Sequence, residues 1–343
     1  MKILVTGAAG FIGSFTAKKL LDLGNTVVGV DNLNDYYDVS LKQARLANLK
    51  PYSNFTFLKL DLSDRSATES LFRKEAFDKI IHLAAQAGVR YSIDHPHAYV
   101  ESNLVGFINV LEGARYQWCN KDNSKNVAGH FIYASSSSVY GLNKHMPFNT
   151  KQAVDHPISL YAATKKSNEL MAHAYSYLYN IPTTGLRFFT VYGPWGRPDM
   201  AYFKFVRSII NNEPIDIYNE GKMKRDFTYI DDVVDSLIKI SEVSPSKITD
   251  WNRINPDSSN SSAPYRVYNI GGSNPVGLME FVNAIEMALD KKAKINFLPM
   301  QSGDVEETWA DNNDLANVIG DIKTTALKNG IAKFVEWYRG YKI

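Results

Sequence analysis

Short apolar runs alternate with longer amphipathic segments through the first 190 residues of the chain. The runs are rich in β-branched residues, as is typical of buried strands, and the segment 11–24 has the apolar spacing of a helix. Strands separated by helical crossovers predict an α/β fold with a doubly wound parallel sheet and helices on both faces. The expected strands lie at residues 2–7, 26–31, 54–62, 79–85, 130–135 and 183–190.

The sequence changes in character after Arg187. Pro, Gly, Tyr and Asn become frequent between shorter elements, and residues 244–264 have the polar composition of a surface loop. This change predicts a first domain at residues 1–186 and a smaller, mixed α/β domain at residues 187–343. A helical pattern around residues 231–242 is expected to pack back on the first domain.

Composition narrows the classes of partner. The formal net charge is only +2 and no Lys/Arg block is present, so nucleic acid is not an expected partner. The single cysteine, Cys119, excludes an internal disulfide and agrees with a reducing cytosol. We find neither a secretory signal nor an apolar run approaching the roughly 20 residues of a membrane-spanning helix. We therefore expect a cytoplasmic protein without a membrane anchor.

A glycine pattern follows the first expected strand. Gly7, Gly10 and Gly13 are spaced G-x-x-G-x-x-G between strand and helix. Glycine permits the tight turn and lets a pyrophosphate approach the backbone, and the N–H groups at the start of the helix point toward the phosphates. Such a turn can also simply connect a strand to a helix, but Asp31 ends the second strand where a carboxylate reaches an adenosine ribose. The combination predicts a dinucleotide site, and the acid favours NAD over NADP.

Residues at the ends of the third and fourth strands extend this site. Asp61 either reaches the adenine or caps the next helix, and the small side chains of Ala84 and Ala85 leave room for a cofactor. His82 at this strand end is more often a buried core residue than a ligand. His95 and His97 flank Pro96 without a carboxylate or cysteine partner at metal spacing, so no metal is predicted. The predicted cofactor-binding residues are Gly7, Gly10, Phe11, Ile12, Gly13, Asp31, Asn32, Asp61, Leu62, Leu83, Ala84, Ala85, Tyr161 and Lys165.

Tyr161 and Lys165 form a candidate catalytic pair. They are four residues apart in a helical pattern, so they share one face about one turn apart. A phenol with a reference pKa of about 10 is a poor base at neutral pH. A neighbouring ammonium and a positive nicotinamide ring favour phenolate and lower that pKa. The spacing is common by chance, but here it follows a dinucleotide fingerprint, so Tyr161 is predicted to take a proton from a substrate hydroxyl.

A row of serines, Ser135 to Ser138, follows the apolar run that begins at His130. A serine run is often only a flexible connection. In a doubly wound sheet, however, ligands bind beyond the carboxyl ends of the strands, which is where these hydroxyls emerge. We expect them to face Tyr161 and the nicotinamide in one pocket.

The ordered motifs of this chain resemble one enzyme family. GxxGxxG, HLAA, SSSxVYG, YxxxK and LRFF follow one another along essentially the full length, as in the extended short-chain dehydrogenase/reductases of the nucleotide-sugar epimerase and dehydratase kind. The resemblance implies a Rossmann-type first domain, a C-terminal domain that binds a UDP-sugar, and a homodimer. It also implies that Ser136 hydrogen-bonds the reacting sugar hydroxyl, that Tyr161 is the base and that Lys165 orients the nicotinamide ribose.

Two serines distinguish this chain from other branches of the family. The 4,6-dehydratases carry an Asp-Glu pair, and the UDP-glucuronate decarboxylases a Glu, where this chain has Ser137 and Ser138. Without that acid, reversible oxidation at C4 is the favoured reaction. Thr190 and Gln301 stand where UDP-glucose 4-epimerases tend to have Asn and Arg, so the chain is most similar to the UDP-glucuronate 4-epimerases. The implied reaction interconverts UDP-glucuronate and UDP-galacturonate through a 4-keto intermediate.

The substrate contacts combine this resemblance with chemistry. A hexuronic acid oxidised at C4 is a β-keto acid, which loses carbon dioxide when its C5–C6 bond aligns with the carbonyl π system. Hydroxyls at Ser137, Ser138 and Thr190 are expected to hold the carboxylate out of that alignment. Arg197 and Arg225 are candidates for the diphosphate, with pairing to Asp199 or Asp226 as the alternative. The predicted substrate-binding residues are Arg90, Ser136, Ser137, Ser138, Tyr161, Thr190, Arg197, Arg225 and, for the uridine ribose, Asp304.

Two other functions stay open. One is a 4-epimerase of UDP-glucose or of a UDP-N-acetylhexosamine, in which Thr190 only lines the pocket. The other is a redox-sensing regulator that keeps the NAD fold without catalysis, although the presence of Ser136, Tyr161 and Lys165 favours an enzyme. The helix near residues 102–115 is a candidate for the dimer interface, and its apolar stripe is equally compatible with packing on its own sheet.

Overall fold

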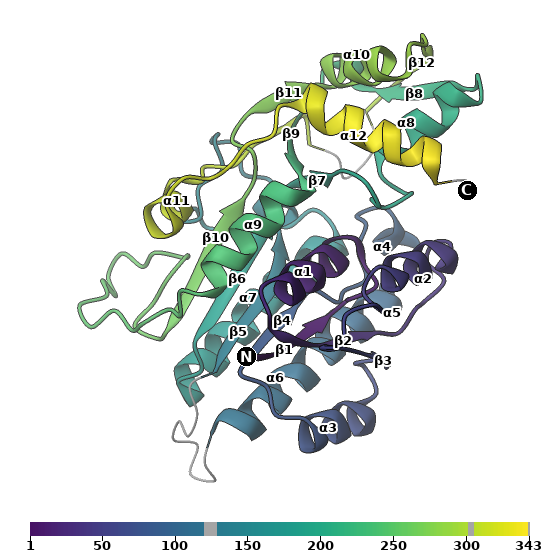
Figure 1. Ribbon diagram of the computed structural model, residues 1–343. Helices are drawn as coiled ribbons and strands as arrows, with labels where there is room; N and C mark the ends of the chain where they lie inside the picture. Colours follow the sequence, from purple (N-terminus) through teal and green to yellow (C-terminus); the bar gives the residue numbers. More distant parts are fainter. Residues whose placement is uncertain (120–128, 301–304, 342–343) are drawn as a thin grey trace.

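The computed structural model describes residues 1–119, 129–300 and 305–341. Its largest layer is a parallel sheet with helices on both faces (Figure 1). The strands are β1 (Lys2–Thr6), β2 (Thr26–Asp31), β3 (Phe55–Lys59), β4 (Lys79–His82), β5 (His130–Ser136), β6 (Thr183–Phe188) and β10 (Tyr265–Ile270). They follow the order β10-β6-β5-β4-β1-β2-β3, so the chain order reverses between β1 and β4. The predicted fold class, a Rossmann-type doubly wound α/β sheet, is confirmed.

Alternation along each strand gives the sheet two cores. In β1, Ile3 and Val5 pack into one core and Leu4 into the other, because successive side chains of a strand point to opposite faces. Strands buried on both faces read as continuous apolar runs. The first core includes helices α1 (Phe11–Asp22) and α9 (Ile230–Ser241). The second includes α3 (Arg65–Lys74), α6 (Gly106–Trp118) and α7 (Leu160–Tyr179).

Shorter helices lie near the carboxyl ends of the strands. Helix α2 (Val39–Ala47) follows β2 and packs beside α1, while a 3₁₀ turn, η2 (Ser137–Tyr140), directly continues β5. The connection from β4 to α6 is formed by α4 (Tyr91–Asp94), α5 (Pro96–Tyr99) and the π-helical segment η1 (Val100–Val105).

The C-terminal part lies at one end of the large sheet (Figure 1). Aromatic rings fill its core; Phe227 stacks on Phe281 at 4.0 Å between ring centroids, and Tyr202 meets Phe334 edge-on at 4.9 Å. A small sheet contains β7 (Thr190–Tyr192), β9 (Lys224–Tyr229), β11 (Pro275–Gly277) and β13 (Glu307–Thr308), and β8 (Pro214–Tyr218) pairs with β12 (Lys294–Leu298). The remaining elements are α8 (Ala201–Ile210), η3 (Asn219–Gly221), α10 (Leu278–Leu289), α11 (Asn313–Ile319) and α12 (Leu327–Gly340).

Elements from both halves of the sequence build the large sheet layer. The helix expected around residues 231–242 is α9, and it packs against α1. Strand β10 also returns from the C-terminal half and pairs with β6. The division at residue 186 therefore stays a prediction about domains.

Neither a membrane-spanning helix nor a metal-binding cluster is found among the described residues. No helix there is both long and apolar enough to cross a membrane. No group of three or more His, Cys, Asp or Glu side chains there could hold a metal ion.

Candidate active site

The glycine-rich turn joins β1 to α1 where the strand order reverses. Gly7 has a φ of +70°, and a Cβ there would lie 2.9 Å from the backbone nitrogen of Ala84. A Cβ at Gly13 would lie 2.0 Å from the Gly7 carbonyl oxygen, so α1 can approach the turn this closely only with glycine. Gly10 is the N-cap of α1 and no side chain caps the helix, which leaves its first N–H groups available to an anion. The turn thus fits the pyrophosphate of a dinucleotide.

A cavity of about 270 Å³ opens over this turn. Every residue predicted to bind the cofactor lines it, including Tyr161 and Lys165 from α7. The loop and helix after β2 add residues that the sequence patterns did not indicate, because they belong to no fingerprint. They are Asn34, Tyr36, Tyr37 and Lys42.

Asp31 is buried beneath the glycine-rich turn. Its carboxylate accepts hydrogen bonds from the backbone N–H groups of Ala9 at 3.1 Å and Leu33 at 2.9 Å. Burial lowers the pKa of Lys42 in the same cavity, and the nearby charge of Asp31 opposes that shift. A carboxylate has about four acceptor sites, so the ribose contact predicted for Asp31 stays compatible with these bonds.

Asp61 lines the same cavity and accepts hydrogen bonds from three groups. Its carboxylate accepts from Asn32 Nδ2 at 3.0 Å, and from the N–H and hydroxyl of Ser63 at 2.9 and 2.7 Å. Burial raises the pKa of Asp61, but these hydrogen bonds outweigh it, so the pKa lies below its ordinary value. The alternative that Asp61 caps the next helix is wrong, because Asp64 is the N-cap of α3 and accepts from the N–H of Ala67.

His82 ends β4 as a buried residue. Its Nδ1 lies 2.9 Å from the Thr6 hydroxyl. Burial lowers the pKa of His82 to about 3, and the charge of Lys165 adds to that shift. It is therefore a neutral core histidine.

Tyr161 and Lys165 lie in the first turns of α7. The helix begins after Ser159, whose hydroxyl accepts from the N–H of Ala162 at 3.1 Å. The buried Lys165 donates from Nζ to the Ala134 carbonyl of β5 at 2.9 Å, which fixes α7 to the strand that carries the serines. Burial lowers the pKa of Lys165 to about 8.

The surroundings of Tyr161 differ in one respect from the sequence-based expectation. Burial raises the pKa of its phenol above the ordinary value, and a hydrogen bond with Ser136 and the positive charge of Arg197 oppose only part of that rise. The expected lowering by Lys165 is not among these effects, since the ammonium is directed to the Ala134 carbonyl. The cation that acts on the phenol in this structure is Arg197.

The serine hydroxyls at the end of β5 point to two different sides of the strand. The Ser135 hydroxyl donates to Glu169 on α7 at 2.7 Å. Ser136 points the other way along the alternating strand, and its hydroxyl accepts from the N–H of Ser138 at 3.2 Å as the N-cap of η2. Ser136, Ser137 and Ser138 line a second cavity together with Tyr161.

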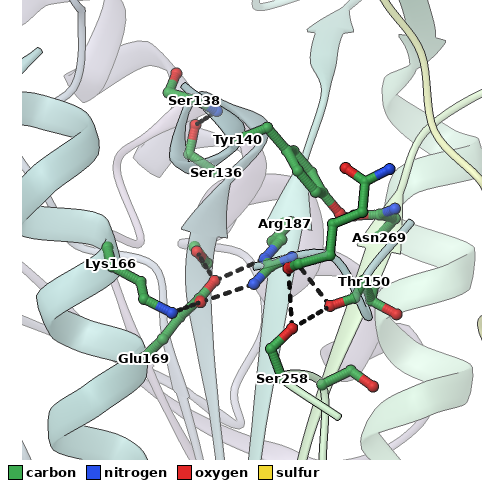
Figure 2. Close-up of polar contacts among 12 residues, drawn as sticks. Ser136, Ser138, Tyr140, Thr150, Lys166, Glu169, Arg187, Ser258 and Asn269 are labelled. Atoms are coloured by element: carbon green, nitrogen blue, oxygen red, sulfur yellow. Dashed lines mark hydrogen bonds and ion pairs between the residues drawn. The ribbon is translucent and has the colours of Figure 1, made fainter. Parts of the chain in front are cut away.

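A buried ion pair supports this strand end from below (Figure 2). Arg187 on β6 donates to both carboxylate oxygens of Glu169, at 2.8 and 2.9 Å, and both side chains are almost fully buried. The guanidinium also lies 4.9 Å from the ring centroid of Tyr140, whose hydroxyl donates to Asn269 at 2.7 Å. These contacts join α7, β6, η2 and β10 directly beneath Ser136.

The second cavity, of about 660 Å³, lies between the serine row and the C-terminal part of the chain. Except for Asp304, which lies outside the described residues, every predicted substrate-binding residue lines it. Exposed Lys204 and Arg207 on α8 also line it. Their spacing of three in an amphipathic pattern indicates that both cations lie on one face of a helix. Nothing in the sequence, however, placed that helix beside the serines.

Arg197 borders both cavities. It donates from Nε to Asp199 at 3.0 Å. The ion pair with Asp199, which was the alternative to diphosphate binding, is therefore present, and Arg197 also lines the predicted substrate cavity. The charge of Asp199 raises the pKa of Arg197 despite burial, which keeps the guanidinium charged.

Arg225 reaches the second cavity from β9. Its guanidinium donates to the carbonyl oxygens of Lys224, Val305 and Glu306 at 2.7 to 3.0 Å. The carboxylate of the neighbouring Asp226 accepts hydrogen bonds from three backbone N–H groups instead, those of Gly272, Ser273 and Ala310, at 2.6 to 3.0 Å.

Known proteins match the chain over this whole arrangement. The NAD dependent epimerase/dehydratase family matches residues 3–255. A probable UDP-glucuronate 4-epimerase of Rhizobium meliloti (strain 1021) is 50% identical, over 98% of this chain and 97% of the relative. UDP-glucuronate 4-epimerase 1 of Arabidopsis thaliana is 44% identical, over 99% of this chain and 77% of the relative.

A solved structure agrees with these relatives. The UDP-glucuronic acid 4-epimerase from Bacillus cereus, in complex with UDP-glucuronic acid and NAD, has a TM-score of 0.85 and 31% identity, over 99% of each chain. The family resemblance and the NAD cofactor predicted from the sequence are confirmed. The chain belongs to the NAD dependent epimerase/dehydratase family.

Proposed function

We propose that the protein is a UDP-glucuronate 4-epimerase, which interconverts UDP-glucuronate and UDP-galacturonate. The observation that carries this proposal is the set of hydroxyls in the second cavity, where Ser137, Ser138 and Thr190 lie with Ser136 and Tyr161. The bacterial and plant UDP-glucuronate 4-epimerases match nearly all of this chain. They bear out the main prediction from the sequence.

The residues shared by the two cavities perform the proton transfer. Tyr161 takes the proton of the sugar 4-hydroxyl as phenolate, and Ser136 hydrogen-bonds the same hydroxyl. NAD, when bound at the glycine-rich turn, supplies a reversible hydride acceptor. Arg197 supplies positive charge beside the phenol. The second cavity falls within the roughly 300–1,000 Å³ of ordinary small-molecule sites, so the 4-keto sugar has room to turn.

The serine and threonine hydroxyls protect the uronic acid during this cycle. The 4-keto intermediate is a β-keto acid, and it decarboxylates when its carboxylate bond aligns with the carbonyl π system. Ser137, Ser138 and Thr190 offer neutral donors, which bind a carboxylate without supplying a proton as an acid would. A Glu in this place would serve a different reaction.

Replacement of Thr190 by valine tests this role of the hydroxyls. The variant keeps the shape of the side chain but removes one donor to a charged group, a loss of about 1.5 kcal/mol. We expect the KM for UDP-glucuronate to rise about tenfold and carbon dioxide with UDP-pentose to appear among the products. Thr190→Ser, which keeps the hydroxyl, is the control. An unchanged KM with no carbon dioxide would remove Thr190 from the carboxylate site.

A panel of UDP-sugars separates this function from its rivals. Purified protein is incubated with UDP-glucuronate, UDP-glucose and UDP-N-acetylglucosamine, and the products are separated by chromatography. We expect conversion of UDP-glucuronate to UDP-galacturonate. Conversion of UDP-glucose alone would support the neutral-sugar epimerase and remove the carboxylate argument. No conversion of any sugar, with NAD bound, would support the redox-sensing regulator.

A homodimer is part of this proposal. Four apolar residues remain exposed on two neighbouring elements of the first part of the chain, Val100 and Val105 on η1 and Leu170 and Leu178 on α7. Exposed apolar residues on adjacent elements favour an interaction surface.

The homodimer predicts a measurable change of mass. Light scattering after size exclusion should give twice the chain mass for the wild-type protein. Leu170→Glu with Leu178→Glu should give the single chain mass, because charges would be buried at the interface. Exposed Leu142→Glu is the control. A wild-type protein of single chain mass at micromolar concentration contradicts the dimer.

A further inference from the structure

Arg45 is a buried cation that the proposed reaction does not use directly. Its side chain lies on α2, is 1% exposed, and makes five hydrogen bonds, the number of its N–H donors. Two go to the Trp195 carbonyl at 2.9 and 2.7 Å and one to Gly196 at 3.1 Å. The others go to the Ala9 carbonyl in the glycine-rich turn at 3.0 Å and to the Tyr37 hydroxyl at 2.6 Å. Arg45 therefore joins the cofactor turn to the segment just before Arg197.

Tyr36 makes a second contact between the same two segments. Its hydroxyl donates to Asp199 at 3.2 Å, and Asp199 holds Arg197 at 3.0 Å. The Tyr36 side chain lines both cavities. Its hydroxyl passes so close to Gly88 that a Cβ there would lie 2.7 Å away. The space for this tyrosine thus depends on a glycine in the loop after β4.

We propose that Tyr36 and Arg45 are positioning residues that hold Arg197 at the junction of the cofactor and substrate cavities. The proposal rests on the proposed function and on the sequence-based prediction that Arg197 binds the diphosphate of the UDP-sugar. Arg45 fixes the backbone two residues before Arg197, and Tyr36 fixes the carboxylate that orients its guanidinium. Both come from the loop and helix after β2, which also line the cofactor cavity.

The geometry makes this arrangement intolerant of change. Among the described residues, the partners of Arg45 are neutral oxygens, so its buried charge depends on all five hydrogen bonds. A lysine has three donors on a flexible stem and cannot reproduce a planar fork. Trp195 has a φ of +62°, a left-handed conformation that is rare for a large side chain. The two Arg45 bonds to its carbonyl hold it in place.

The test uses Arg45→Lys and Tyr36→Phe in the NAD-containing protein. Calorimetry measures the Kd of UDP alone, and product formation gives kcat and KM for UDP-glucuronate. We expect both the Kd and the KM to rise about tenfold, with kcat within about threefold of wild type, because diphosphate binding is common to ground and transition states. Tyr52→Phe is the matched control, since Tyr52 hydrogen-bonds Asp22 at the surface.

The outcomes separate this proposal from the proposed function. A wild-type protein that leaves UDP-glucuronate unchanged overturns the proposed function. The binding of UDP does not depend on which sugar is converted, so the Kd values of UDP would still decide whether Tyr36 and Arg45 position Arg197. Wild-type Kd values in both variants overturn the positioning role. A lowered melting temperature with unchanged Kd and KM also overturns it, since that shows a structural role only. If Arg45→Lys does not fold, Tyr36→Phe, which lacks a single hydroxyl, decides the question.

Discussion

Replacement of Tyr161 by phenylalanine should lower kcat for epimerisation by about 10³-fold while NAD remains bound, because general base catalysis contributes on that order. The variant removes the only atom of the side chain that can take the 4-hydroxyl proton and leaves the ring in place. Activity is measured by separation of UDP-glucuronate from UDP-galacturonate, and bound NAD by its release from the denatured protein.

Tyr177→Phe is the matched control for this variant. Tyr177 lies on the same helix but is 62% exposed, so its loss of a hydroxyl should not change turnover. Unchanged turnover in Tyr161→Phe would remove Tyr161 as the base. Loss of NAD together with turnover would show that the tyrosine is needed to hold the cofactor, and the loss of turnover would then not identify Tyr161 as the base.

The charges around Tyr161 explain why the base depends on its partners. Burial raises the pKa of the phenol, so an isolated tyrosine at this position would be a weaker base than one in water. Ser136 and Arg197 oppose that rise, and the pKa of the phenol still lies above its ordinary value. Arg197 is paired with Asp199, so the guanidinium proposed to bind the diphosphate also carries its charge near the base.

The sequence was sufficient wherever the signal is local. The glycine spacing, Asp31 and the Tyr161/Lys165 pair each combine residue types with a fixed distance along one turn, strand or helix. Such patterns survive without knowledge of the tertiary structure, because the backbone geometry of one element sets them. The same residues line the cofactor cavity of the structure.

Contacts between distant segments could not be predicted in this way. Arg45 and Trp195 are separated by 150 positions and meet only after the two parts of the chain are packed together. The direction of Lys165 was also missed, since its partner is a backbone carbonyl that no side-chain pattern reveals. One signal was available and not used. Arg187 stands inside an apolar strand, and a buried charge there requires a partner.

That partner gives the largest expected effect on stability. Arg187 and Glu169 are 0% and 2% exposed at the side chain and share two hydrogen bonds. Removing one member of a buried pair costs about 3–5 kcal/mol, because the other charge stays buried, and Glu169 would keep only Lys166 at 3.8 Å and the Ser135 hydroxyl. Arg187→Met should lower the free energy of unfolding by that amount, as measured by urea denaturation. Lys18→Met, which breaks the exposed pair with Asp22, should cost about 0.3–0.5 kcal/mol.

The pH dependence of this loss identifies Glu169 as its cause. In the wild type, burial raises the pKa of Glu169 but the charge and hydrogen bonds of Arg187 lower it further, so the pair stabilises the fold above the unfolded-state pKa and is lost only in acid. In Arg187→Met, Lys166 at 3.8 Å and the Ser135 hydroxyl still lower the pKa of Glu169, but the two lowering effects of Arg187 are gone, and we expect burial to raise the folded-state pKa above its ordinary value. Stability of the variant then falls as pH rises above about 4.3, the ordinary pKa of glutamate. The difference from wild type should therefore be larger at pH 8 than at pH 5. An equal difference at both values would place the cost in lost packing against Tyr140 instead of the uncompensated carboxylate.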